Sequence, residues 1–465
     1  MSFKTYALED VLEITSSKRI KMADYVQSGI PFYRSKEIIE KSNNQPVSTD
    51  IFITCEHFDK IKMKFGAPEV GDILLTSVGT LGVSYQVSDD DLFYFKDGNL
   101  TWFRNFDGRV LSGYIYCWLK SPLARKKLDE ISIGTTQRAL TIASLKKIQI
   151  KIPSLDVQKK IVFIYESLSK KIINNSKINQ TFEQMAQALF KNWFVDFEPV
   201  KAKIAVLESG GSQEEATLAA MTAISGKSAD VLAIFEREHP EQYAELKATA
   251  ELFPSAMQDI DLFNIPRGWS LVPLSNIASF ASGKINVSEL TKDIYISTEN
   301  MLGNKMGIER ATSLPSSNTT PSFNPGHILI SNIRPYFKKI WLARFSGGRS
   351  ADVLAFEHKK HITAEYLYNI LYQDSFFDFM MQTSKGVKMP RGDKKAIMEW
   401  LCIEPTIELV RLFSNKVKEF YSYIESHNRE NIQLSQLRDT LLPKLLSGEI
   451  TLPEAEEIAK EADYV

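Results

Sequence analysis

The chain contains two copies of one sequence pattern. The run YIYCWLKS, which begins at Tyr114, is matched by YLYNILYQ, which begins at Tyr366, an offset of about 252 residues. At that offset apolar positions coincide through about eighty residues without a gap, as Leu189 does with Leu441. Because each copy of a repeat buries apolar surface in the same way, a duplication of this length predicts two related structural halves.

Each copy has a mixed first part and a helical second part. The first parts, 1–155 and 266–405, contain short apolar runs such as ILLTSV and HILISNI, separated by glycine, proline and single helices. The second parts, 156–200 and 406–465, each open with about 40 residues of helical spacing, interrupted only by Pro443. We therefore predict an α/β (α+β) fold with two globular domains, separated by two long helices and related by a pseudo-two-fold repeat.

Both helical segments carry the apolar seam of a coiled coil, with spacings that alternate between four and three. One seam runs from Ile161 to Trp193, and the other runs from Phe413 to Leu445. The polar residues at the two midpoints are Asn175, Asn179, His427 and Asn431. An antiparallel pair would bring these midpoints together, where the polar groups can satisfy one another and fix the register; the alternative is that they face solvent. Each helix would be about 60 Å long and would hold the two domains apart.

Net charge is distributed unevenly along the chain. The 465 residues include 56 Lys and Arg against 57 Asp and Glu, and the resulting −1 argues at first against nucleic-acid binding. By segment the net charge is +2 for 1–150, +2 for 151–200, −6 for 201–265, +5 for 266–405 and −4 for 406–465. The acidic excess lies in 201–265, which we interpret as a helical insertion or linker, and in the C-terminal tail. Both globular domains are net positive.

The familiar catalytic motifs are absent or incomplete. The run SGKS (Ser225–Ser228) ends like a phosphate-binding loop, but Met221 stands where that loop needs a glycine. No GxGxxG follows a strand-like run, so no dinucleotide or methyl-donor cradle is indicated. His358 and His361 flank two lysines without an HExxH pattern, and FEHK with Asp352 upstream is only a faint nuclease signature. We predict no catalytic residue, no metal site and no cofactor in this chain.

Signals for secretion and membrane insertion are also missing from the sequence. The first residues, MSFKTYALED, lack the basic-then-apolar pattern of a signal peptide, and no stretch approaches the roughly 18 apolar residues of a membrane span. Cys55, Cys117 and Cys402 are too scattered for a zinc site or a disulfide framework. We expect a cytoplasmic protein.

Two polar, basic loops occupy the same place in the two copies. GTTQRALT begins at Gly134, and GVKMPRGDKK begins at Gly386. Gln and Arg make paired hydrogen bonds to adenine and guanine edges, and lysines hold phosphates. Two similar reading heads suit two sites on one duplex, so we predict that the heads contact DNA. The predicted DNA-binding residues are Thr76, Ser77, Thr80, Thr135, Thr136, Gln137, Arg138, Asn332, Arg334, Lys338, Lys339, Lys385, Lys388 and Arg391. Further candidates are Lys60, Lys62 and Lys64; the alternative for any one of these cations is a solvated surface charge.

Three runs are the most distinctive in the chain: LRDTLLPKLLSGEI (437–450), FKNWFVDFEPVKAK (190–203) and IKIPSLDVQKKIV (150–162). With GTTQRALTIASLKKIQIKIP, they make the chain resemble the DNA specificity (S) subunits of type I restriction–modification systems over essentially its whole length. The second copy departs from the family pattern, because VKMPRGDKK replaces TTQRALT and the residues after Pro405 lack the usual Glu-Gln pair.

The resemblance implies two target-recognition domains, each of which reads one half of a split double-stranded DNA site. It also implies two long helices that pair antiparallel, set the length of the unspecified spacer and dock two methyltransferase (M) subunits, which recruit restriction (R) subunits. Methylation, cleavage, S-adenosylmethionine, ATP and Mg would then belong to the partners. The alternatives are a coiled-coil adaptor that binds only protein, and a stand-alone nuclease or methyltransferase.

Overall fold

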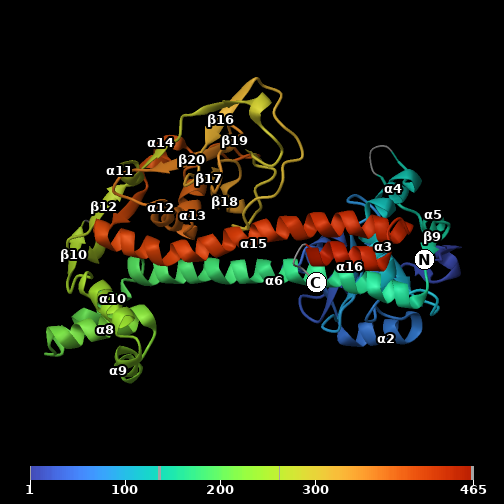
Figure 1. The fold of residues 1–465 in the computed structure, drawn as a ribbon, viewed down its shortest axis with the longest axis horizontal. Coiled ribbons are helices and arrows are strands. Elements are labelled where there is room, and N and C mark those ends of the chain that lie inside the picture. Colours follow the sequence, from blue (N-terminus) through green and yellow to red (C-terminus); the bar gives the residue numbers. More distant parts are fainter. Residues whose placement is uncertain (1, 135–137, 261, 462–465) are drawn as a thin grey trace. The chain divides into compact units, whose positions relative to one another are not determined.

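The computed structural model describes residues 2–134, 138–260 and 262–461. It divides into two compact units: unit 1 comprises 1–177 and 427–465, and unit 2 comprises 178–426. Two long helices, α6 (Leu155–Phe194) and α15 (Ile407–Ser447), each contribute one part to unit 1 and the rest to unit 2 (Figure 1).

Unit 1 is built on two small sheets and a terminal strand pair. The larger sheet is antiparallel, in the order β2 (Glu13–Thr15), β8 (Leu100–Arg104), β5 (Ile73–Thr76) and β6 (Ser84–Gln86). The smaller has the order β4 (Phe52–Ile53), β3 (Ile30–Tyr33) and β7 (Tyr94–Phe95), with β3 and β7 parallel. β1 (Lys4–Ala7) pairs with β9 (Gln149–Ile152) and closes the domain. All four residues of β5 are buried, which explains its continuous apolar run.

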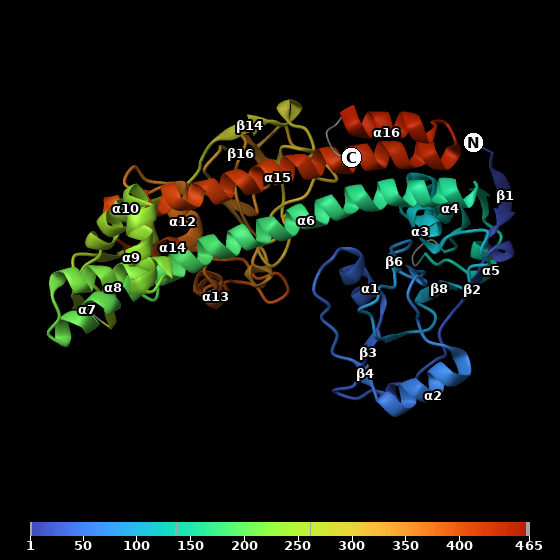
Figure 2. The ribbon, with the colours of Figure 1, turned by 60° about the horizontal axis from the view of Figure 1, so that its bottom comes forward.

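Short helices complete unit 1 (Figure 2). They are α1 (Ser35–Ser42), α2 (Cys55–Phe65), α3 (Ser112–Lys120), α4 (Pro122–Ile131), α5 (Ile142–Lys146) and α16 (Leu452–Glu461), with 3-10 turns η1 (Leu8–Asp10) and η2 (Met22–Asp24). α4 begins after Ser121, whose hydroxyl accepts a hydrogen bond from the N–H of Ala124 at 3.3 Å. Pro122 then occupies the first turn, where a missing N–H costs no helical hydrogen bond.

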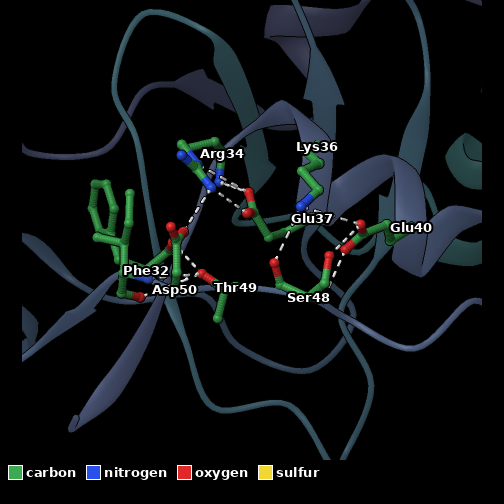
Figure 3. A network of polar contacts seen from close by, with 9 residues as sticks. Phe32, Arg34, Lys36, Glu37, Glu40, Ser48, Thr49 and Asp50 are labelled. Atoms are coloured by element: carbon green, nitrogen blue, oxygen red, sulfur yellow. Dashed lines mark hydrogen bonds and ion pairs between the residues drawn. The ribbon is translucent and has the colours of Figure 1, made fainter. Parts of the chain in front are cut away.

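A polar network anchors the start of α1 (Figure 3). The backbone N–H of Arg34 donates to Glu37 at 2.7 Å, and its guanidinium donates to Glu37 at 2.8 Å and to Asp50 at 3.2 Å. The hydroxyl of Ser48 donates to Glu40 at 2.7 Å, so the following loop is also tied to the helix. The side chain of Glu37 is fully buried. Burial opposes its ionisation, but the hydrogen bonds from Arg34 outweigh burial, and the pKa of Glu37 lies below its ordinary value of 4.5.

The main core of unit 1 needs both long helices. Ile161 and Leu168 of α6 and Leu441 and Leu445 of α15 belong to the same buried cluster as Phe103 of the larger sheet. Leu452 and Ala455 of α16 belong to this cluster as well. The first domain is therefore completed by residues that follow unit 2 in the sequence.

The sheets of unit 2 follow a plan similar to that of unit 1, and several of their strands are labelled in Figure 1. Its antiparallel sheet has the order β13 (Ala278–Phe280), β20 (Val353–His358), β17 (Ile328–Ser331) and β18 (Ile340–Leu342). Its second sheet has the order β14 (Lys284–Asn286), β16 (Thr319–Phe323), β19 (Gly347–Arg349) and β15 (Tyr295–Ile296), with β15 and β19 parallel. β12 (Ser270–Pro273) pairs with β21 (Leu401–Glu404), as β1 does with β9. The duplication of the sequence is thus a duplication of the fold.

The helices of unit 2 lie around these sheets and in the segment that follows α6. Those of the domain are α11 (Leu274–Ile277), α12 (Ala364–Leu371), α13 (Asp374–Gln382) and α14 (Lys394–Glu399), with 3-10 turns η3 (Val287–Glu289) and η4 (Pro335–Phe337). The following segment forms α7 (Glu198–Glu208), α8 (Gln213–Ser225), α9 (Ala229–Glu238), α10 (Pro240–Glu251) and a hairpin of β10 (Met257–Ile260) and β11 (Phe263–Pro266). The ammonium of Lys203 is buried and donates to the carbonyl oxygens of Ala250 and Phe253, at 2.9 Å and 2.7 Å. These bonds satisfy carbonyls at the C-terminal end of α10.

The two long helices pack antiparallel in both units. In unit 1 the amide of Asn175, which is 3% exposed, donates to Asn431 at 3.0 Å and to Glu430 at 2.6 Å. In unit 2 the ring of Phe182 stacks on that of Phe420, with centroids 5.7 Å apart. A residue further along α6 therefore contacts a residue earlier in α15, which means that the two helices run in opposite directions. The predicted antiparallel pairing is confirmed. The alternative that the midpoint polar residues face solvent is wrong for Asn175.

No single helix in the described ranges is long and apolar enough to cross a membrane. α8 and α9 together meet the criteria of length and composition, but they are bent by 87° with respect to each other.

Candidate nucleic-acid interface

In unit 1, two loops meet beyond the end of β5. One is the turn between β5 and β6, residues 77–83, and the other is the loop that carries GTTQRAL. Val78 forms an isolated β-bridge with Ala139, and the N–H of Leu140 donates to the carbonyl of Ser77 at 2.9 Å. Backbone contacts therefore hold the second loop against the first. Thr135, Thr136 and Gln137, three of the predicted DNA-binding residues, lie outside the described residues.

In unit 2, the equivalent loops meet through equivalent bonds. The turn between β17 and β18, residues 332–339, lies against the loop that carries GVKMPRG. Ile333 forms a β-bridge with Arg391, and the N–H of Gly392 donates to the carbonyl of Asn332 at 3.3 Å. Each of these atoms occupies the place that the repeat assigns to its counterpart in unit 1. The pair of loops in unit 1 and the pair of loops in unit 2 are thus held together by the same backbone contacts.

Two predicted residues of unit 1 lie in its interior rather than on its surface. Thr76 is 0% exposed, and its hydroxyl accepts a hydrogen bond from the N–H of Val83 at 2.9 Å. Ser77 is 2% exposed, and its hydroxyl lies 2.5 Å from that of Thr101. Because β5 is covered on both faces, the polar side chains at its end are buried and form hydrogen bonds inside the domain. The position of these two residues corrects the prediction: they shape the turn and offer no free group to DNA.

Asn332 is a third predicted residue that the fold buries. It is 7% exposed, its side-chain amide donates to the carbonyl of Gly392 at 3.2 Å, and its N–H donates to the carbonyl of Asp352 at 2.8 Å. A Cβ at position 392 would lie 2.8 Å from the side-chain oxygen of Asn332, so glycine allows this close approach. Asn332 holds the second loop in place and does not face outward.

Most of the predicted cations are partly neutralised by carboxylates. The ion pairs are Arg138 with Asp129 (2.9 Å), Lys338 with Asp374 (2.9 Å), Lys385 with Asp393 (2.5 Å) and Arg391 with Asp352 (3.2 Å). Lys339 instead donates to the carbonyl of Thr298 at 2.7 Å, and burial lowers its pKa. Exposed ion pairs of this kind are weak, worth about 0–1 kcal/mol. A phosphate can therefore replace the carboxylate as partner at little cost.

Three of the predicted DNA-binding residues are exposed and are not held by an ion pair within the described residues. Arg334 and Lys388 make no ion pair with any residue in the described ranges, and Thr80 is also exposed. The N–H of Arg334 donates to the carbonyl of Pro390 at 2.8 Å, so the turn and the loop that carry the two cations are joined. Unpaired cations on a fixed backbone are suited to phosphate or guanine contacts.

Unit 1 has a basic ridge formed by Lys18, Arg19, Lys21, Lys62 and Lys64. The sequence predicted only its lysines on α2. Lys60 is paired with Glu56 at 2.6 Å, whereas Lys62 and Lys64 are exposed at the end of α2. The ammonium of Lys18 lies 5.0 Å from the ring centroid of Phe65. The run that brings Lys18 there also carries exposed Arg19 and Lys21. The cluster of cations in the run SSKRIKM is visible in the sequence. Its position beside α2 is visible only in the fold.

No group of three or more His, Cys, Asp or Glu within the described parts of the chain could hold a metal ion. Elsewhere in the core, burial raises the pKa of the Cys402 thiol to about 12, so this cysteine is a packing residue.

The chain is similar to known proteins along most of its length. Residues 2–184 match the family model described as Type I restriction modification DNA specificity domain. Over 432 residues, 88% of this chain and 93% of the relative, it is 32% identical to the Type I restriction enzyme HindI specificity subunit of Haemophilus influenzae. Over 411 residues, 83% of this chain and 78% of the relative, it is 24% identical to the Type I restriction enzyme MjaIX specificity subunit of Methanocaldococcus jannaschii.

Among solved structures, the fold is similar to that of the S subunit of a type I restriction–modification system from M. genitalium. The TM-score is 0.50 at 15% identity, over 96% of both chains. On the strength of the relative from H. influenzae, the chain belongs to the family of DNA specificity subunits of type I restriction–modification systems.

Proposed function

We propose that this specificity subunit reads a bipartite double-stranded DNA site, one half through each of the recognition domains 1–155 and 266–405. The observation that supports this proposal is the repeated frame of the paired loops. In both units backbone bonds hold the turn against the loop at equivalent positions, while the exposed side chains differ. Sequence readout needs a constant frame that presents variable side chains to base edges.

The predicted DNA-binding side chains fall into groups according to whether they are ion-paired in the structure without DNA. Arg334 and Lys388 of unit 2 are unpaired within the described residues, so we assign them direct DNA contacts. The ion-paired cations, and the basic ridge of Lys18, Arg19, Lys21, Lys62 and Lys64, are assigned to the phosphate backbone. In unit 1 we retain Thr80, Thr135, Thr136, Gln137 and Arg138 as the reading residues.

As a specificity subunit the chain is the non-catalytic member of a type I restriction–modification complex, and S-adenosylmethionine, ATP and Mg belong to its partner subunits. We further propose that two M subunits dock on the paired helices α6 and α15, that R subunits join through M, and that the complex works in the cytoplasm. The contact surface would be the exposed stripe of these helices, since their seams are occupied by each other.

The double variant Arg334→Ala/Lys388→Ala, assembled with M subunits, tests the assignment in unit 2. We expect weaker binding to the cognate duplex by about 1–3 kcal/mol for each base contact, or a salt dependence reduced by about one ion for each phosphate contact. Binding is measured by fluorescence anisotropy across a salt series, and the methylated sites are mapped by long-read sequencing.

Lys360→Ala is the matched control. Lys360 is an exposed lysine that follows β20, and the register of β17 against β20 puts it at the end of the sheet opposite the paired loops. Unchanged affinity and site choice in the double variant would remove these two cations from the interface. A wild-type complex that binds scrambled and cognate duplexes equally would favour a protein-binding adaptor instead.

A further inference from the structure

The turn between β17 and β18 projects two aromatic rings from unit 2. Tyr336 is 48% exposed and Phe337 is 41% exposed, and their ring centroids are 4.6 Å apart. Aromatic side chains of this size are normally buried, and two neighbouring exposed rings indicate a surface that is covered by a ligand. The run RPYFKK, with aromatic residues between cations, carried this signal in the sequence.

The backbone of this turn is held in an uncommon conformation. Seven residues other than glycine have positive φ in the part of the chain that the structure describes; Arg334 and Lys338 lie in this turn, and Asn304 and Lys305 lie in the loop that contacts it. Such a conformation is disfavoured for residues with a Cβ, and it persists only where the surrounding structure imposes it.

A second loop, which carries Asn304 and Lys305, holds the turn in this positive-φ conformation. The N–H of Asn304 donates to the carbonyl of Phe337 at 2.7 Å, and the N–H of Lys305 donates to the carbonyl of Lys338 at 2.8 Å. Pro335 begins the single turn η4 between the two residues with positive φ, Arg334 and Lys338. The two rings are therefore presented on a braced platform, so that little conformational freedom remains to be lost on binding.

The surroundings of the rings are cationic. Lys305 and Lys338 share one carboxylate, that of Asp374, at 2.7 Å and 2.9 Å. The ammonium of Lys339 lies 5.7 Å from the ring centroid of Phe337. Arg334 begins the turn, and its backbone is bonded to Pro390 of the loop that carries Lys388. A ring pair surrounded by an excess of positive charge is complementary to a polyanion with apolar faces, which is the chemistry of a base-pair step within its phosphates.

We propose that Tyr336 and Phe337 form an aromatic wedge that packs into a base-pair step of the half-site read by unit 2 and opens its stacking. The proposal rests on the proposed function and adds to it a shape-dependent term, because opening a step is easiest at flexible pyrimidine–purine sequences. The flanking cations hold the phosphates on both sides of the opened step.

Unit 1 has no such wedge at the equivalent turn. Its residues between β5 and β6 include Gly79, Thr80 and Gly82, and its apolar residues are Val78, Leu81 and Val83, none of which is aromatic. The two domains should therefore deform their half-sites differently. The half-site read by unit 1 becomes an internal control in every experiment on the complex.

The test uses the full-length subunit assembled with its M subunits. Duplexes carrying the mapped site receive a fluorescent purine analogue at each purine in turn, except at the methylated base, which a methyltransferase draws out of the stack by itself. We expect the fluorescence to rise at one step of the half-site read by unit 2 and at no step of the other. Tyr336→Ala/Phe337→Ala should abolish that rise and weaken cognate binding on the order of tenfold, the loss of about one stacking contact.

Phe263→Ala is the matched control, since Phe263 is a 47% exposed aromatic residue on β11 of the same unit; it should leave the fluorescence rise and the affinity unchanged. Thermal melting and gel filtration with M establish that the double variant folds and assembles. No fluorescence rise in the wild-type complex, or a rise that survives in the double variant, would overturn the wedge.

Loss of M binding without loss of the rise would also overturn it and would mark the rings as a protein contact. Failure of the proposed function looks different: methylation would then show no bipartite site, and Arg334→Ala/Lys388→Ala would also be without effect.

Discussion

Glu37, the buried carboxylate of the α1 network, gives unit 1 a dependence on pH. Its folded pKa lies below 4.5, so the stabilisation from its bonds to Arg34 is present above that pH and is lost as the pH falls through the folded pKa. We expect Glu37→Gln to lower the free energy of unfolding by about 1–3 kcal/mol at pH 7, and we expect the difference to shrink as the pH falls below 4.5 and through the folded pKa. Chemical denaturation at pH 7 and at a series of pH values below 4.5 measures it.

Glu40→Gln controls for the loss of a carboxylate from α1, because Glu40 binds the hydroxyl of Ser48 and not Arg34. A difference between wild type and Glu37→Gln that is unchanged throughout the series below pH 4.5 would contradict a stabilising role of the ionised Glu37.

At the scale of single residues the sequence could identify loops but not the direction of their side chains. Thr76 lies four residues before exposed Thr80 and Asn332 lies two residues before exposed Arg334, yet both side chains are buried. Direction depends on the strand register and on the partner loop, which are long-range properties. Arg334 and Lys388 are exposed, as expected of cations in polar loops, and their contact with DNA stays a prediction. Tyr336 and Phe337 were missed because an aromatic pair in a loop is more often buried than exposed.

Helices α6 and α15 are the elements with the sharpest consequence for function. If they set the spacer of a bipartite site, a heptad added to both should lengthen it, because seven residues add about 10 Å, roughly 3 base pairs. The insertions belong between Lys177 and Ile178 and between Ser426 and His427, at the boundary of the two units. Mapping of the methylated sites in a host that carries the variant shows the new spacer.

A heptad added to one helix alone is the control, because it shifts the apolar seam of one helix against the other and should disrupt the pair. An unchanged spacer in the double insertion would show that these helices do not act as the ruler.

The elements differed in how far the sequence could define them. The long helices were predictable because their apolar spacing persists over about ten turns, and Asn175 and Asn431 marked the midpoint at which they meet. Strands such as β7 and β15 span only two residues each, and no periodicity exists at that length. Their pairing is set by contacts between distant parts of each domain, which is why the sequence indicated strands without giving the order of the sheets.

At the scale of the whole molecule, the duplication predicts that each half of the DNA site can be altered alone. Replacing Thr136, Gln137 and Arg138 together by alanine should abolish specific binding and methylation while assembly with M is preserved, because these positions lie outside the sequence of the two long helices α6 and α15. Gel filtration reports assembly, and methylation mapping reports the site.

The unit 2 variant Arg334→Ala/Lys388→Ala is the complementary control, since it should relax only the other half of the site. Unchanged site selectivity in the triple variant would remove this loop from the recognition surface.

The way the chain shares its residues between the units also fixes the order in which they can mature during synthesis. Unit 2 is one continuous stretch, 178–426, and is synthesised before the last part of α15. Most of unit 1 is synthesised before unit 2, yet its core includes Leu434, Leu441 and Leu445, which are made only after the whole of unit 2. The first domain therefore waits with an uncovered apolar face while the second is translated. A nascent chain that stalls after residue 426 and before Leu445 leaves the earlier domain, and not the later one, dependent on chaperones.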